Sequence, residues 1–285
     1  MKSLFLFAFV LVFTAGPFTM IGQAQDHKRQ KTEEIVTNHI KSIGSLEVLA
    51  KISNQVALGD ISFRILRSGG AGADGKIVLA SEDKKILMGM SFSVANYPRE
   101  VIVFDGENSK ISFAYNNVRS PLGNYLYRYS NVLKEGLLGG VLSAGWALKK
   151  LDEKKARVEF KGTRKIDGKE VYALSYMPRG GSDLEIYIFI DKENFWHVRT
   201  EYRRIISAGQ SISPDASSSI RERREVLVED FSDYKQVNGL TLPYRYKIYL
   251  MLEGQTLNEY EWTANFASFL FNQQLDPDSF NTKEK

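Results

Sequence analysis

The sequence predicts an α+β protein in which an antiparallel sheet of about ten or eleven strands curls around a few helical segments. Two observations lead to this prediction. From Ile61 onward, apolar and polar residues alternate in many short runs, and Asp-Gly turns separate several of them. Helical patterns precede the first strand, and a further helical segment interrupts the strands near mid-chain. This order of elements favours one long meandering sheet with few helices.

The N-terminus has the pattern of a secretory signal peptide. Lys2 precedes an apolar run that begins at Leu4, and the small residues Gly22 and Ala24 come just before a polar segment. We expect cleavage after Ala24, which leaves residues 25–285 as a single domain. The alternative is an uncleaved anchor, because the apolar stretch is long. The chain contains no cysteine, so we expect neither disulfides nor lipidation at the cut, and the exported protein should be soluble.

Two helices are expected before the first strand. Apolar residues recur at helical spacing in Lys28–Ile43, and Gly44 follows as a stop signal. Ser45 is a candidate N-cap for a second, short helix. A polar stretch at residues 209–219 is expected to be a long hairpin loop between two strands.

The mid-chain helical insert, at about residues 121–151, contains an uncharged segment, Gly136–Leu148. The segment is too short to cross a bilayer, which takes roughly 20 apolar residues, so it must be buried in protein or cover something apolar. Its four glycines each weaken a helix by about 1 kcal/mol relative to alanine. We therefore expect the surroundings to hold this segment in place, and we expect that it can move.

The charge balance gives no indication of a nucleic-acid partner. Without the first 24 residues, 37 Lys and Arg residues oppose 34 Asp and Glu residues, a formal charge of +3. This excess is too small for the basic surface that nucleic-acid binding needs.

Catalytic and metal-binding patterns are also missing from the sequence. Residues Gly70–Lys76 match the start of a phosphate-binding loop, but Ile77 replaces the Ser or Thr that holds magnesium, and a strand pattern follows. His27, His39 and His197 lack the spacing of metal ligands. No nucleophile, base and orienting group occur in a recognisable pattern. We predict no catalytic residue, no metal and no cofactor.

Several segments resemble, in order and spacing, the LolA/LolB-like outer-membrane lipoprotein-sorting superfamily. These segments cover most of the mature chain and consist largely of turns followed by strands. They are the helix ending near Ile43-Gly44, Val103–Gly106, Ile166–Tyr172, Ile190–Glu193, Phe231–Tyr234, Val237–Leu240, Leu242-Pro243 and Phe271–Phe280.

The resemblance implies a strongly curved antiparallel sheet, an incomplete β-barrel, which helices close over an apolar cavity. It also implies a periplasmic, monomeric carrier that binds lipid or the acyl chains of lipoproteins and that can meet envelope membrane proteins. The insert is then the candidate lid. The residues expected to face the ligand are Tyr125, Leu126, Tyr129, Leu133, Leu137, Leu138, Leu142 and Trp146. The same side chains could instead fill the barrel as a core, and the sequence leaves both interpretations open.

Two other functions compete with the carrier. The same fold could serve an envelope sensor or interaction protein that binds a protein partner. An exported hydrolase is the least favoured, because it needs a catalytic group that the sequence does not display. The chain also departs from the superfamily in its longer insert and in the polar loop around Pro214.

Overall fold

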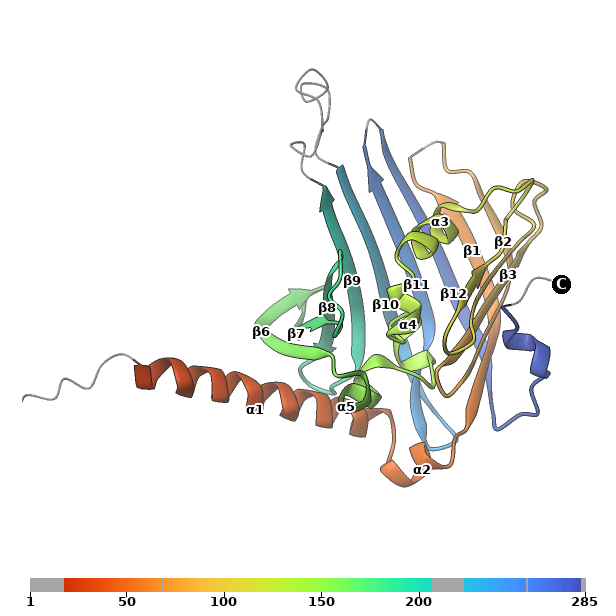
Figure 1. The fold of residues 1–285 in the computed structure, drawn as a ribbon. Helices are drawn as coiled ribbons and strands as arrows, with labels where there is room; N and C mark the ends of the chain where they lie inside the picture. Colours follow the sequence, from red (N-terminus) through yellow and green to blue (C-terminus); the bar gives the residue numbers. More distant parts are fainter. Residues whose placement is uncertain (1–17, 68, 207–222, 255, 283–285) are drawn as a thin grey trace, which may run out of the picture.

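The computed structural model describes residues 18–282 except 68, 207–222 and 255. A single, strongly curved antiparallel sheet of twelve strands makes up most of the protein (Figure 1), which confirms the predicted sheet. The expected number of ten or eleven strands is one or two too low. The short strand β5 (Ser109–Ile111) follows the Asp105-Gly106 turn. The predicted loop at residues 209–219 lies outside the described residues.

Most strands pair with their sequence neighbours as antiparallel hairpins. Besides β5, the strands of the sheet are β1 (Asn54–Ile65), β2 (Gly72–Glu82), β3 (Lys85–Phe92), β4 (Arg99–Phe104), β6 (Arg157–Ile166), β7 (Lys169–Met177), β8 (Glu185–Asp191), β9 (His197–Ile206), β10 (Arg223–Val237), β11 (Leu240–Glu253) and β12 (Leu257–Phe271).

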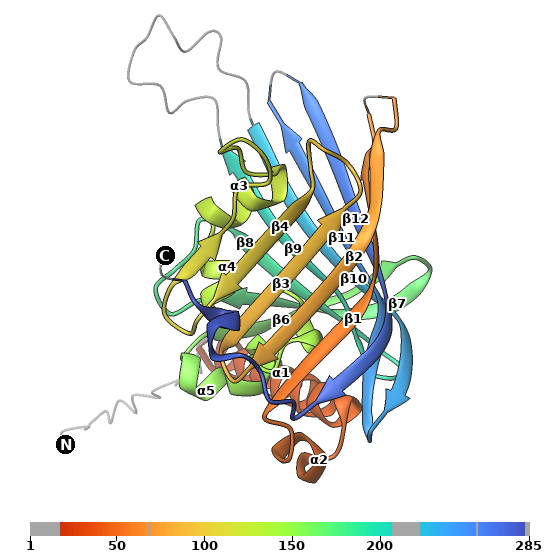
Figure 2. The ribbon, with the colours of Figure 1, turned by 90° about the vertical axis from the view of Figure 1, so that its right-hand side faces the viewer.

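The order of strands across the sheet is β5-β4-β3-β2-β1-β12-β11-β10-β9-β8-β7-β6. The first strand pairs with the last, so that Phe63 lies opposite Trp262. Strands β5 and β6 form the two edges and do not pair with each other, so the sheet stays open. Figures 1 and 2 show the resulting half-barrel from two sides.

The helices are few and short, apart from the first. They are α1 (Phe18–Ile43), α2 (Leu46–Ala50), α3 (Pro121–Arg128), α4 (Asn131–Lys134) and α5 (Leu151–Lys154), with 3-10 turns η1 (Gly140–Leu142), η2 (Ala147–Lys150) and η4 (Pro277–Phe280).

Helix α1 ends at Ile43, as predicted, but it begins at Phe18 rather than Lys28. Residues 18–24 were left out of the predicted fold as part of the cleavable segment, although no proline separates them from the amphipathic pattern. The predicted cut after Ala24 therefore falls within this helix. Residues 1–17 of the predicted signal peptide lie outside the described residues. Within the described chain, no helix combines the length and the apolar character that a membrane span requires.

Local sequence signals account for several element ends. The Ser45 hydroxyl accepts a hydrogen bond from the Val48 amide at 3.2 Å, which confirms the predicted N-cap of α2. Asp167 and Gly168 have φ values of 48° and 83° and connect β6 to β7, as their Asp-Gly sequence predicts. Gly70 lies in the turn between β1 and β2, so the apparent phosphate-loop match is a hairpin followed by a strand.

The concave face of the sheet packs against the helical part of the connection between β5 and β6. This part, residues 121–154, is here called the insert. Figure 1 shows the insert lying inside the curve of the sheet. Its apolar side chains form one buried cluster with those of the strands, for example Leu79, Ile188 and Leu250. On the convex face, Phe280 of η4 packs in a separate small cluster with Val56 and other residues of β1–β4 (Figure 2).

Gly140 is held in a left-handed conformation at a point of close packing. Its φ is 49°, and an added Cβ would lie 2.5 Å from ring atoms of His197. We predict that Gly140→Ala destabilises the protein by about 2–4 kcal/mol, because strain in the backbone adds to overpacking. Chemical denaturation measures the effect.

Gly180→Ala is the matched control, since nothing lies within 4 Å of an added Cβ there. Its stability should stay within about 0.5 kcal/mol of the wild type. Equal stability of both variants would show that the insert adapts easily at Gly140.

Candidate functional site

The eight residues predicted to face a ligand all lie in the interior of the half-barrel. Seven are at most 1% exposed, and Tyr129 is 8% exposed. All eight belong to the same apolar cluster as the inner face of the sheet. In this conformation they fill the concavity. Whether they ever meet a ligand depends on movement of the insert, so their binding role stays a prediction.

A buried glutamate of the sheet fastens the middle of the insert. Glu229 on β10 accepts hydrogen bonds from the Gly139 amide at 2.7 Å, the Tyr202 hydroxyl at 2.5 Å and the Tyr246 hydroxyl at 2.5 Å. Burial raises the pKa of Glu229 to about 7, although the three hydrogen bonds act in the opposite direction. The carboxyl therefore links three neighbouring strands to the insert.

A second buried glutamate holds the start of the insert. Glu100 on β4 accepts hydrogen bonds from the Ser120 hydroxyl at 2.5 Å and from the Tyr97 hydroxyl. Ser120 is in turn the N-cap of α3, where its oxygen accepts from the Gly123 amide at 2.8 Å. Burial raises the pKa of Glu100. Trp262 donates to the Tyr97 oxygen at 3.0 Å and completes this network.

The end of the insert meets α1 through a histidine and a tryptophan. The Trp146 indole donates to Nε2 of His39 at 2.9 Å, and the Nδ1 atom of His39 lies 2.9 Å from the Phe195 carbonyl oxygen. His39 is therefore a neutral ring with its proton on Nδ1, and burial lowers its pKa to about 4. His197 stacks on Trp146 with ring centres 4.6 Å apart, and its buried Nδ1 has no hydrogen-bond partner.

These histidines have no arrangement suited to catalysis or metal binding. Burial lowers the pKa of His197 as well, so both rings are neutral and enclosed. The described residues include no group of three His, Asp or Glu side chains placed to hold a metal ion. The networks around Glu229, Glu100 and His39 hold the insert in position, and all three side chains are fully buried in this conformation.

An open groove lies on the outside, between α1, the end of the insert and β6. Its volume is about 1170 Å³, slightly above the usual range of small-molecule pockets. Five apolar side chains contribute to its lining: Val36, Leu148, Leu151, Ala156 and Val158. The polar lining residues are Lys28, Arg29, Thr32, Glu33, Thr37, Lys149, Asp152, Lys155, Arg157 and Glu159. None of the eight predicted residues lines this groove.

Two polar contacts hold the wall of the groove together. The Thr32 hydroxyl of α1 accepts a hydrogen bond from the Phe160 amide of β6 at 2.9 Å. The Ser42 hydroxyl donates to the Phe195 carbonyl oxygen at 3.0 Å, next to the His39 contact. Helix α1 is thus attached at both ends of its packed part, and it covers the edge strand β6.

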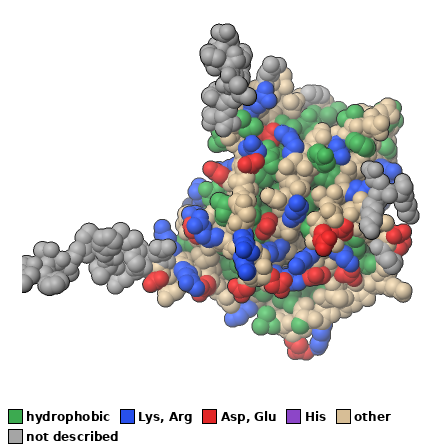
Figure 3. Space-filling model, viewed as in Figure 1, with side chains coloured by type: hydrophobic (Ala, Val, Ile, Leu, Met, Phe, Trp, Pro, Cys, Tyr) green, Lys and Arg blue, Asp and Glu red, His purple; other side chains and the backbone are tan. Residues whose placement is uncertain are grey.

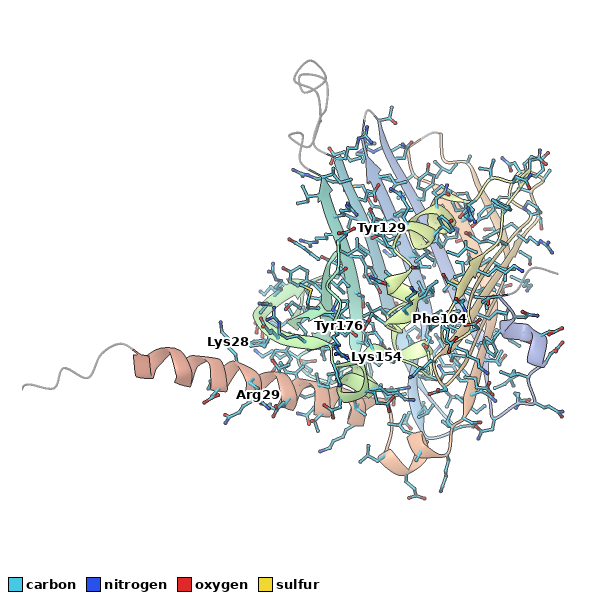
Figure 4. The ribbon with its side chains drawn as sticks, viewed as in Figure 1. Lys28, Arg29, Phe104, Tyr129, Lys154 and Tyr176 are labelled. Carbon is cyan, nitrogen blue, oxygen red and sulfur yellow. The ribbon has the colours of Figure 1, made fainter. Side chains whose placement is uncertain are left out.

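The charges of the groove differ in how they are neutralised. Arg29 pairs with Glu33 at 3.1 Å, and Arg157 pairs with Glu159 at 3.3 Å. Lys149 is half-buried, and its ammonium makes one long contact, 3.5 Å, to a backbone carbonyl oxygen. Figure 4 marks Lys28 and Arg29 on α1 beside the β6–β7 hairpin, and Figure 3 shows basic and acidic side chains mixed on this side of the molecule.

Sequence reasoning did not find this groove. Its lining comes from two segments that are far apart in the chain, residues 28–37 and 148–159, and each of them alone resembles an ordinary charged surface. The one available signal was an apolar residue, Val158, within the charged strand β6.

Comparisons with known proteins identify similar structures but no similar sequence. No family model and no curated protein matches the chain. Among solved structures, a LolA superfamily protein from Nitrosomonas europaea matches with 13% sequence identity and a TM-score of 0.47. A DUF1329 family protein from Desulfovibrio piger matches with 10% identity and a TM-score of 0.43. A putative outer membrane lipoprotein-sorting protein domain from Vibrio parahaemolyticus matches with 14% identity and a TM-score of 0.41. Each match covers 88% of this chain and 97% of the other.

The class that the fold and the site define is a curved antiparallel half-barrel, with a buried insert and an external amphipathic groove. The identities are at most 14% and the TM-scores are below 0.5, so the functional argument below uses the residues of this chain.

The raised pKa of Glu229 predicts a specific pH dependence of stability. An unfolded glutamate has a pKa near 4.5, so the folded state resists ionisation until about pH 7. The contribution of Glu229 to the free energy of unfolding is therefore largest below pH 4.5. It is lost as the pH rises to about 7, because the unfolded state ionises first. Over this pH interval, the free energy of unfolding of the wild type should fall by up to about 3 kcal/mol relative to that of Glu229→Gln.

Denaturation curves of both proteins between pH 4 and 8 measure this difference. Glu225→Gln is the control, because it also removes a carboxylate from β10. The Glu225 carboxylate contacts Arg128 and Tyr129. A constant difference between wild type and Glu229→Gln at every pH would contradict the prediction.

Proposed function

We propose that this protein is a non-catalytic carrier or binding protein for the acyl chains of lipids or lipoproteins, and that the groove beside α1 receives the chain. The observation that supports the proposal is an open space of about 1170 Å³ whose lining combines five apolar side chains with ten polar or charged ones. Such a lining suits a ligand with an apolar body and a polar end.

The affinity in this proposal comes from burial of methylene groups. Each buried CH₂ contributes about 0.8 kcal/mol, so a few methylenes give reversible binding and a long chain gives tight binding. A groove that stays open to solvent allows the ligand to leave, which a carrier requires. The predicted signal peptide agrees with a periplasmic carrier, and the proposal takes it to act as a monomer.

The eight interior residues form a second part of the proposal. They would contact an acyl chain after the insert has moved away from the sheet. This movement breaks the bonds of Gly139 to Glu229 and of Trp146 to His39, and also the 2.9 Å bond from the Ala144 amide to the Ser81 hydroxyl. The closed arrangement is therefore the resting state, and a ligand has to compensate for the lost contacts.

A protein-binding role is the second candidate, and one surface feature favours it. Phe113, Tyr115 and Tyr127 are 47–60% exposed near the start of the insert. The Arg119 guanidinium lies 4.6 Å from the ring centre of Phe113 and 4.1 Å from that of Tyr127. Exposed tyrosine and arginine side chains are enriched in the energetic centres of protein interfaces.

Filling the groove tests the carrier function. Ala156→Trp places a large side chain in the lining, and we expect it to weaken binding of a fluorescent fatty-acyl probe at least tenfold. Ala267→Trp, at an exposed position on β12, is the control and should bind as the wild type does. Unchanged binding in Ala156→Trp would remove the groove from the proposal. A wild type that binds no acyl probe would leave the protein-binding role.

Hydrogen exchange tests the second part of the proposal. The insert consists of short helices and turns rather than long paired strands, so residues 136–148 should exchange faster than β10 and β11. Adding the acyl probe should speed this exchange further if the insert is displaced. Protection equal to that of the strands, unchanged by the probe, would show that the eight residues are a permanent core.

A further inference from the structure

Lys149 is a half-buried cation in the groove that lacks a counter-ion. Among the described residues, no carboxylate oxygen lies within salt-bridge distance of its Nζ atom, and its one hydrogen bond is the 3.5 Å contact to the Ser143 carbonyl oxygen. A buried charge is costly unless it is paired and hydrogen-bonded. The Lys149 ammonium therefore lacks an anionic partner among the described residues.

The neighbours of Lys149 do not supply that anion. Glu33 and Glu159 line the same groove, but each already pairs with an arginine. The adjacent Lys150 pairs with Asp83, outside the groove lining. Asp152 is exposed on α5, and Lys28, Lys155 and the neutral His39 add no negative charge.

Apolar side chains lie beside Lys149 in the groove, together with charged ones of both signs. Leu148 and Leu151 flank it in sequence and line the groove, together with Val36 of α1. Burial lowers the pKa of Lys149 to about 8, with a smaller contribution from Lys150. A free inorganic anion would satisfy the charge but would leave the apolar lining uncovered.

We propose that Lys149 binds the anionic head group of an amphiphile whose acyl chain covers the apolar lining of the groove. This inference deepens the proposed acyl-chain binding and depends on it. A carboxylate and a phosphate share the required chemistry, because both accept hydrogen bonds from an ammonium group. The ligand class is therefore a fatty acid or a phosphate-bearing lipid, and a neutral chain should bind less tightly.

Calorimetric titration with decanoate, decyl phosphate and 1-decanol, three ligands with the same ten-carbon chain, tests this inference. We expect the two anions to bind more tightly than the alcohol, and the tighter anion identifies the head group. Lys149→Gln should weaken the anions about tenfold and leave 1-decanol unchanged. Lys150→Gln is the matched control and should bind all three ligands as the wild type does.

Each outcome has a distinct meaning. Unchanged anion binding in Lys149→Gln, or an equal loss for 1-decanol, would overturn the head-group site while acyl binding stands. A wild type that binds none of the three ligands would overturn the acyl-binding function itself. Lys149→Met, which keeps an apolar stem of similar length, replaces Lys149→Gln in the test if thermal unfolding shows that the glutamine variant does not fold.

Proton uptake provides an independent readout. At pH 8, near the pKa of Lys149, part of the side chain is neutral. A bound carboxylate favours the charged form, so decanoate should draw a fraction of a proton from the buffer, measured as a binding enthalpy that varies with the buffer used. Lys149→Gln and 1-decanol should show no such uptake. Decanoate binding without proton uptake by the wild type would contradict the assignment.

Discussion

The structure depends on one constraint, which is that an open, strongly curved sheet has a concave apolar face and no second sheet to cover it. The chain covers that face with its own insert. Strands β5 and β6 lie at opposite edges of the sheet, so the segment that connects them has to cross the opening. The connection and the filling of the half-barrel are therefore the same piece of chain.

The irregular insert explains why polar side chains are buried inside an apolar core. A segment of short helices and turns leaves some of its backbone groups without internal partners, and the sheet provides partners for these. The Glu229 carboxylate accepts a hydrogen bond from the backbone amide of Gly139, and the Ser81 hydroxyl accepts one from the backbone amide of Ala144. The side-chain amide of Gln55 donates to the Leu142 carbonyl oxygen. Desolvation of Glu229 costs stability, and its two tyrosine partners offset part of that cost.

Helix α1 forms one wall of the open groove and contacts the filled interior. It lies against the edge strand β6 and is fixed there by Thr32, while His39 ties it to Trp146 at the end of the insert. Through this contact the groove and the interior share a wall, since Leu148 lines the groove and Trp146 lies in the core. A ligand at the groove is thus near the element whose displacement would open the interior.

The amino-acid sequence by itself determined the class of fold, the turns and the apolar character of the insert. Alternation, Asp-Gly turns and the Ser45 cap are local signals, and each acts within a few residues. The helix start was missed, because a cleavable segment and a helix can share the same apolar residues.

Only the tertiary structure decided which side chains are enclosed and which are open. The eight insert residues are apolar in either case, and the packing of the sheet around them makes them a core in this conformation. The groove assembles α1, residues 148–156 and β6, and the missing counter-ion of Lys149 is a property of this assembly. Sequence patterns report local periodicity, whereas burial and charge pairing depend on contacts between distant segments.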